Sequence, residues 1–148
     1  MNHAEKAYEL FKSGYNCAQA VAVAFCDVTG LSPEFSAKMA SSFGGGLGRL
    51  REVCGAVSGM AMVAGLLYGY DGPETGEEKM AHYERVQEMA AKFREANSSI
   101  ICREILKNPS TDPAPSPRTA EYYAQRPCAR MVYTAAKILE EYIEAHPV

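Results

Sequence analysis

The sequence of 148 residues has little of what marks several large classes of protein. It has no stripe of Lys and Arg, and its formal net charge of -3 argues against a nucleic-acid partner. The longest apolar run, near residues 53–67, is interrupted by glycine and is too short to cross a bilayer comfortably. The N-terminus lacks the apolar core and cleavage site of a secretory signal. These absences predict a cytoplasmic protein without membrane insertion, folded as one domain over residues 1–148.

Common catalytic and metal-binding motifs are also missing. No GK[ST] follows the glycine-rich stretch, and no CxxC pair marks a zinc ribbon. The histidines His3, His82 and His146 are far apart, and none has a partner at ligand spacing. No Ser-His-Asp order and no pair of acidic residues stands out. The chemistry of the chain is therefore expected to rest on its five cysteines.

Strand patterns are absent as well, because apolar residues recur at helical spacing nearly throughout and β-branched runs are few. About seven helices are expected, at residues 3–12, 17–28, 33–43, 51–68, 77–96, 98–106 and 127–145. Four prolines within residues 107–117 predict an extended loop, and residues 120–125 add a turn. The predicted fold is all-α, a compact helical bundle. Its fourth helix is small or apolar on nearly every side, so we expect it to be central and buried.

Four of the five cysteines fall at or near predicted helix starts, and these are Cys17, Cys54, Cys102 and Cys128. Unpaired backbone N–H groups and the positive end of the helix dipole gather there. A thiolate is stabilised at such a place, and its pKa falls below the free value of about 8.5. These sulfurs are therefore predicted to act as anions, either as nucleophiles or as metal ligands. Cys26, late in the second helix and out of phase with Cys17, is expected to be a core residue.

Cys54 is the strongest candidate for a reactive thiol, and it lies in the stretch FGGGLGRLREVCGAVSG. Arg49 and Arg51 precede it, and they either add positive potential or pair with acids on the surface. Gly55 and Gly59 share one helix face, where each glycine costs about 1 kcal/mol relative to alanine. Something is therefore expected to approach that face closely: another helix, a second subunit in a homodimer, or a flat cofactor.

The glycines at residues 44–46 and 48 have two interpretations. A dinucleotide fingerprint needs a strand before its glycines, and here a helix precedes them. The end of one helix, followed by a flexible turn into the next, agrees better with the pattern. Binding of an anion at the following helix start remains a second interpretation.

Four segments, NCAQAVAVAF, FGGGLGRLREVCGAVSGMAMVAGLLYG, ICREIL and PCARMVYTAAKILEE, resemble the C_GCAxxG_C_C family of redox-active proteins. The resemblance covers most of the chain, and the central motif corresponds to residues 54–59. The four cysteines of the family's motif correspond to the four cysteines at predicted helix starts. Cys26 has no counterpart in the motif. The resemblance implies redox activity or binding of a metal cluster, without naming a substrate. A related domain in split-Soret cytochromes has cysteines suited to an iron–sulfur site, but without a CxxCH motif no covalent haem is expected here.

Three functions remain open from these residues. In a thiol redox protein, a thiol-dependent oxidoreductase if it is an enzyme, Cys54 attacks or is oxidised and another of the four cysteines resolves the product as a disulfide. In an electron carrier, the four thiolates hold a metal or an iron–sulfur cluster. In a non-catalytic module, the glycine-lined helix packs against a partner. The first is ranked slightly ahead because it needs no unseen atom, and its redox partner is unknown from sequence.

Overall fold

A computed structural model describes residues 1–73, 76–107 and 109–148 of the chain. Within these ranges the chain forms helices and no strand, and one isolated bridge pairs Val53 with Ile101. The helices are α1 (His3–Lys12), α2 (Cys17–Ala24), α3 (Cys26–Thr29), α4 (Pro33–Ala40), the 3₁₀ helix η1 (Ser41–Phe43), α5 (Gly55–Tyr68), α6 (Gly76–Asn97), α7 (Cys102–Leu106), α8 (Ala120–Gln125) and α9 (Cys128–Ala145). The predicted all-α class is confirmed, and Asn108 of the predicted proline-rich loop lies outside the described residues.

Short side chains cap several helices as the sequence predicts. Asn16 accepts a hydrogen bond from the backbone N–H of Gln19, whose side chain in turn accepts from the N–H of Asn16. This capping box pairs two backbone donors that the first turn of α2 leaves free. Ser32 caps α4 with Pro33 at its first position, again as expected. Local sequence therefore determines where these helices begin.

The prediction of one helix over residues 17–28 is wrong. Phe25 leaves the helical conformation, and its N–H pairs with Ala22 O three residues back, as in a tighter 3₁₀ turn. Cys26 therefore begins α3 and is half-buried outside the main core, where its Sγ lies 3.3 Å from Ser36 Oγ. Because of this break and the added helix α8, the described residues form nine α-helices where about seven were expected.

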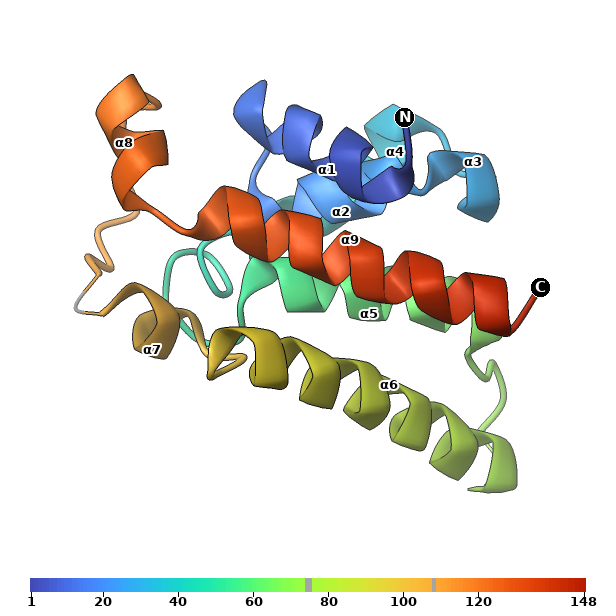
Figure 1. Ribbon diagram of the computed structural model, residues 1–148. Helices are drawn as coiled ribbons and strands as arrows, with labels where there is room; N and C mark the ends of the chain where they lie inside the picture. The colour runs from blue at the N-terminus through green and yellow to red at the C-terminus, as the bar shows by residue number, and fades with distance from the viewer. Residues whose placement is uncertain (74–75, 108) are drawn as a thin grey trace.

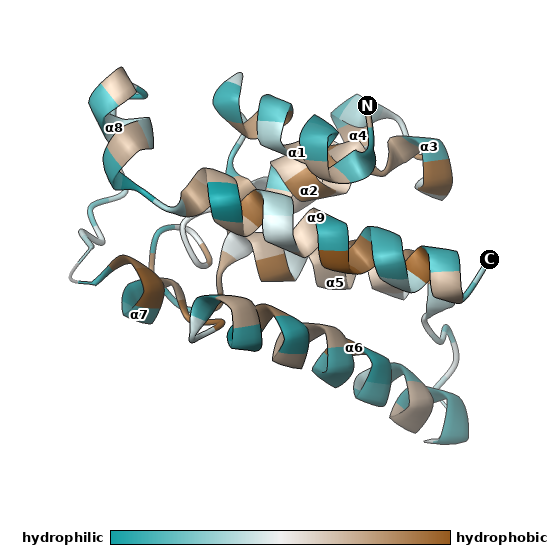
Figure 2. Ribbon diagram, in the orientation of Figure 1, coloured by the Kyte–Doolittle hydropathy of each residue, from teal (hydrophilic) through white to brown (hydrophobic). Residues whose placement is uncertain are grey.

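Helix α5 runs through the middle of the bundle (Figure 1). It packs against α2, α9 and α6, while α1 lies along α9 and also contacts α2. Most of the first ten residues of α5 are buried, and its ribbon in Figure 2 is pale or brown where α6 alternates with teal. The predicted buried central helix with glycines is confirmed. None of the described helices combines the length and the hydrophobicity that crossing a membrane takes.

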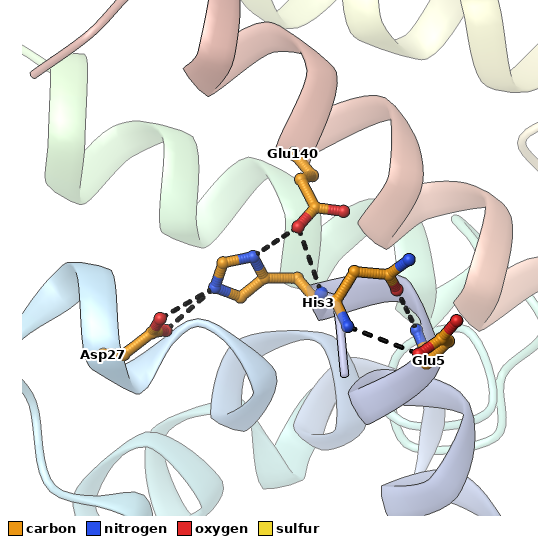
Figure 3. A network of polar contacts seen from close by, with 5 residues as sticks. His3, Glu5, Asp27 and Glu140 are labelled. Carbon is orange, nitrogen blue, oxygen red and sulfur yellow. Dashed lines mark hydrogen bonds and ion pairs between the residues drawn. The ribbon is translucent and has the colours of Figure 1, made fainter.

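His3 joins three elements of the bundle, α1, α3 and α9 (Figure 3). Its ring stacks on Phe25 with centroids 4.3 Å apart, Nδ1 lies 2.8 Å from Glu140 Oε1, and Nε2 lies 2.9 Å from Asp27 Oδ1. This contact holds the start of α1 against α3 and α9.

Candidate functional site

A cavity of about 430 Å³ lies at the end of the bundle where α2, α5, α7 and α9 begin, on the left in Figure 1. The four cysteines at helix starts all line it: Cys17, Cys54, Cys102 and Cys128. The sequence placed these four sulfurs at helix starts one by one, and the fold brings those starts together around one space. Cys26 does not line the cavity.

Cys17 and Cys128 form one pair. Cys17 is the first residue of α2 and Cys128 is the first residue of α9, two helices that pack against each other. Each thiol affects the pKa of the other, so the two side chains are neighbours although 110 residues separate them in the chain. Both remain free thiols.

This proximity makes the two thiols unequal. The side chain of Cys17 favours the Cys128 thiolate and lowers the pKa of Cys128 to about 7. The positive charges of Arg126, Arg118 and Arg51 act in the same direction, and burial opposes them. The neighbouring Cys128 side chain and burial raise the pKa of Cys17. Cys128 is therefore the thiol with the greatest thiolate fraction near neutral pH.

Cys54 and Cys102 form a second pair, and backbone hydrogen bonds fix the positions of both residues. The N–H of Cys54 donates to Ile100 O at 2.7 Å, and the N–H of Cys102 donates to Glu52 O at 2.6 Å. These bonds flank the bridge between Val53 and Ile101, so the segments that lead into α5 and α7 run side by side. The two cysteines are therefore held near each other by main-chain contacts, which side-chain substitution leaves in place.

Cys54 is the N-cap of α5, and its pKa departs from the expected direction. Burial raises the pKa of Cys54 to about 12, although the N–H groups of Ala56 and Val57 act to lower it. The expectation of a low pKa at Cys54 is wrong, because the thiol is only 5% exposed and desolvation outweighs the helix start. Burial also raises the pKa of Cys102, against the opposing effect of Arg51.

Arg49 and Arg51 lie in the loop before α5 rather than on the helix, which begins at Gly55 instead of near residue 51. Both have left-handed backbone conformations, with φ of 65° and 64°. Such conformations cost non-glycine residues about 1–3 kcal/mol each, and they persist where the surrounding structure holds them. Neither arginine forms an ion pair with a carboxylate of the described residues, so the interpretation that they pair with surface acids is wrong.

Arg51 faces Cys102. It is 3% exposed, its Nε donates to Ser110 O at 2.8 Å, and its Nη1 lies 3.7 Å from Cys102 Sγ. Its Nη2 is buried without a hydrogen-bond partner among the described residues. Arg49 donates from Nε to Asp112 O at 2.7 Å. The positive potential of Arg51 thus acts on Cys102 and Cys128, whereas burial dominates at Cys54.

The glycine-rich loop folds tightly against this site. Gly46 has a φ of 73°, and a Cβ built there would lie 2.7 Å from the backbone N of Glu52 and 2.8 Å from Cys102 Cβ. Only glycine lets the loop pass so close to Cys102. The loop follows a 3₁₀ helix that ends at Phe43, which agrees with the turn between helices that the sequence predicts.

Helix α2 packs closely against Gly55 and Gly59 of α5. A Cβ at Gly55 would lie 3.1 Å from Cys17 Cβ, and a Cβ at Gly59 would lie 2.7 Å from Ala18 O. Of the three interpretations of this glycine face, close packing of another helix agrees with these contacts. The glycines thus bring Cys17 to the start of α5.

Sequence reasoning missed two arginines of the cavity, Arg118 and Arg126. Arg118 donates to Phe11 O and Tyr15 O at 3.0 and 3.1 Å, and its guanidinium lies 4.4 Å from the Phe11 ring centroid. Arg126 lies 5.1 Å from the ring centroid of Tyr122. One signal was present for Arg126: it precedes a helix-starting cysteine by two residues, much as Arg51 precedes Cys54 by three.

The four thiols share a cavity without converging on one point. Among the described residues, no three Cys, His, Asp or Glu side chains are grouped closely enough to hold a metal ion. The arrangement does not fit a single bound metal as it stands, because a tetrahedral thiolate site needs all its sulfurs about 2.3 Å from the ion. The geometry suits exchange between neighbouring thiols more directly.

The fold and site define a helical protein with four cysteines around one cavity, two of them neighbours. A family model described as "Putative redox-active protein (C_GCAxxG_C_C)" matches residues 15–142, which is most of the chain. The chain therefore belongs to the C_GCAxxG_C_C family, as its resemblance implied. No curated protein and no solved structure matches it.

Proposed function

We propose that the protein is a dithiol redox protein in which Cys128 and Cys17 exchange two electrons with a partner disulfide. The observation that carries the proposal is that these two neighbouring cysteines begin two helices packed against each other and line the same cavity. It supplies both requirements of a redox dithiol, a sulfur favoured as a thiolate and a second sulfur within reach. Cys128 therefore takes the attacking role that the sequence favoured for Cys54.

The exchange proceeds in two displacements. The Cys128 thiolate attacks one sulfur of the partner disulfide, forming a bond to that sulfur while the other leaves as a thiolate and takes a proton from solvent. Cys17 then gives its proton to solvent and attacks Cys128 Sγ, and the second partner sulfur leaves and is protonated. Two protein thiols become one disulfide and the partner disulfide becomes two thiols, so two electrons pass to the partner.

Cys54 and Cys102 supply a second dithiol beside the first. Burial keeps them protonated at neutral pH, so they attack slowly on their own. Their place in the same cavity as Cys17 and Cys128 lets a disulfide formed in the first pair pass to the second by exchange, with no net change of oxidation state. In this proposal they extend the capacity of the site from two electrons to four.

Equilibration in glutathione buffers of graded potential tests the proposal. After alkylation of the remaining thiols, peptide mass spectrometry is expected to find a reversible disulfide between Cys17 and Cys128 at less oxidising potentials than any other pair. Cys17→Ser and Cys128→Ser should each abolish it, and Cys26→Ser, outside the cavity, should leave it unchanged. If no pair among the four cavity cysteines oxidises reversibly, the proposal is wrong.

A second candidate function is an electron carrier in which the four thiolates hold a metal or an iron–sulfur cluster. It is supported by the four cysteines sharing one cavity, since four thiolates are the common ligand set of such clusters. We rank it second because the sulfurs would have to move together before they could share a metal. Anaerobic purification with metal analysis and an absorption spectrum tests it, and a colourless protein free of metal contradicts it.

A further inference from the structure

The side chains that line the cavity include four arginines and no acidic residue. The arginines are Arg49, Arg51, Arg118 and Arg126. None of the four forms an ion pair with a carboxylate of the described residues. Burial lowers the pKa of Arg49, and the neighbouring charges of Arg51 and Arg126 lower it further, which is the result of crowding like charges. An anion in the cavity would relieve this repulsion.

One nitrogen of the Arg51 guanidinium, Nη2, has no hydrogen-bond partner among the described residues. Nε and Nη1 are occupied by Ser110 O and Cys102 Sγ, which fix the plane of the guanidinium. Nη2 is buried and has no partner within the described chain. A buried charged donor left without an acceptor is costly, so native proteins pair nearly all of them. The described residues therefore leave the N–H groups of Arg51 Nη2 without an acceptor.

Three of the four cavity thiols, including the proposed attacking thiol of Cys128, are buried. Cys54, Cys102 and Cys128 are 5%, 7% and 8% exposed, so they lie in the wall of the cavity and not on the outer surface. A disulfide on a folded protein cannot approach such a sulfur without opening the site. A cavity of about 430 Å³ has the size of pockets that bind small organic ligands.

We propose that the cavity binds a low-molecular-weight disulfide that carries carboxylates, with one carboxylate among the arginines that line the cavity and a sulfur presented to Cys128. The assignment of this substrate rests on the proposed dithiol function, whereas the anion site rests on the arginines alone. Arg126, two residues before Cys128, adds charge next to the attacking sulfur. The carboxylate orients the disulfide, and the exchange then follows the two displacements described above.

Two disulfides of similar size, the dianion dithiodipropionate and the neutral hydroxyethyl disulfide, distinguish the effect of substrate charge from the reactivity of the protein thiols. Prereduced protein is mixed with each, and the rate of formation of the Cys17–Cys128 disulfide is measured. The dianion is expected to react about tenfold faster or more, the effect of one charge-assisted hydrogen bond to a buried arginine. Arg51→Gln should remove this advantage, measured as the ratio of the two rates. Because the variant also loses a charge that lowers the pKa of Cys128, the rate with the neutral disulfide should fall as well, so the ratio reports the anion site.

Arg126→Gln is the second variant. Arg126 is half-exposed, so its substitution leaves the buried side chain of Arg51 in place. It should reduce the advantage of the dianion in the same direction. The control is Arg130→Gln, an exposed arginine of the same helix α9 that does not line the cavity, and it should change neither rate. Calorimetry of dithiodipropionate with the Cys17→Ser, Cys128→Ser protein gives binding without reaction, and Arg51→Gln should abolish it.

The outcomes separate the two proposals. Equal rates for the two disulfides, with a rate ratio that neither arginine variant changes, overturn the anion site and leave the dithiol function standing. If neither disulfide oxidises the protein but calorimetry detects binding that depends on Arg51, the anion site stands and the dithiol function and its substrate fall. Oxidation by neither disulfide together with no binding overturns both.

Discussion

At the scale of single residues, the reactivity of each thiol follows from what surrounds its sulfur. Cys54 has the helix start that favours a thiolate, yet burial raises its pKa to about 12. Cys128 has a helix start, the neighbouring Cys17 and three arginines, and together these outweigh burial. A helix N-terminus contributes a modest stabilisation within one turn, and desolvation of a charge can exceed it. Position at a helix start is therefore insufficient to select the attacking thiol.

Alkylation of Cys128 should report this environment. With iodoacetamide and quantification of the peptide by mass spectrometry, the rate at Cys128 is expected to rise with pH through a midpoint near 7, since only the thiolate reacts. Cys17→Ala removes the neighbouring thiol that favours the Cys128 thiolate, so the midpoint should move to higher pH. A midpoint at or above the free value of about 8.5 in the unaltered protein would contradict the assignment.

At the scale of elements, two pairs of segments assemble the site. Gly55 and Gly59 let α2 approach α5, which carries Cys17 to the start of α5. The backbone bonds of Cys54 and Cys102 join the segments before α5 and α7. The contact between α2 and α5 is made at glycines, and the contact between the segments before α5 and α7 is made by main-chain hydrogen bonds. Neither contact therefore depends on the thiol groups. The site is thus preformed in the reduced protein.

Substitution of glycines on α5 tests the close approach of α2. A Cβ at Gly59 would lie 2.7 Å from Ala18 O, so Gly59→Ala should destabilise the protein by about 1–3 kcal/mol through overpacking, despite the better helix propensity of alanine. Gly65→Ala is the matched control on the same helix, because its Cβ would meet only His82 Nε2, at 3.8 Å. It should leave stability unchanged or raise it by up to about 1 kcal/mol. Urea unfolding followed by circular dichroism measures both, and equal effects would contradict the packing.

At the scale of the whole molecule, the cavity lies where four helices begin, and its cysteines come from opposite ends of the chain. Cys17 lies near the N-terminus on α2, and Cys128 begins the last helix α9. A disulfide between them would close most of the chain into one loop. Oxidation should therefore change the stability of the entire fold as well as the chemistry of the cavity.

The oxidised protein is expected to unfold at a higher temperature than the reduced protein. Closing a loop of more than a hundred residues removes entropy from the unfolded chain, worth about 4–5 kcal/mol by the loop-closure relation. Thermal unfolding in oxidised and reduced glutathione measures the difference. The shift should disappear in Cys17→Ser and persist in Cys26→Ser. An unchanged or lower unfolding temperature on oxidation would show that the disulfide strains the native packing.

The sequence by itself determined the all-α class, the buried central helix and the four helix-starting cysteines. Those features depend on patterns within one or two turns: apolar periodicity, caps such as Asn16 and Ser32, and glycines where helices meet. It also determined the family, because the four cysteines stand in recognisable segments. The sequence did not predict the break of the second helix at Phe25, because no glycine or proline marks that position.

Only the tertiary structure decided which sulfurs meet and which of them ionises. The contact between Cys17 and Cys128 spans most of the chain, and nothing local to either residue specifies it. Burial of Cys54 and the entry of Arg118 and Arg126 into the cavity likewise depend on how the helices pack. Capping and helix dipoles act within a turn, whereas desolvation and long-range pairing are properties of the assembled fold. The chemistry of the cavity is therefore set by packing, on a framework of helix starts that the sequence specifies.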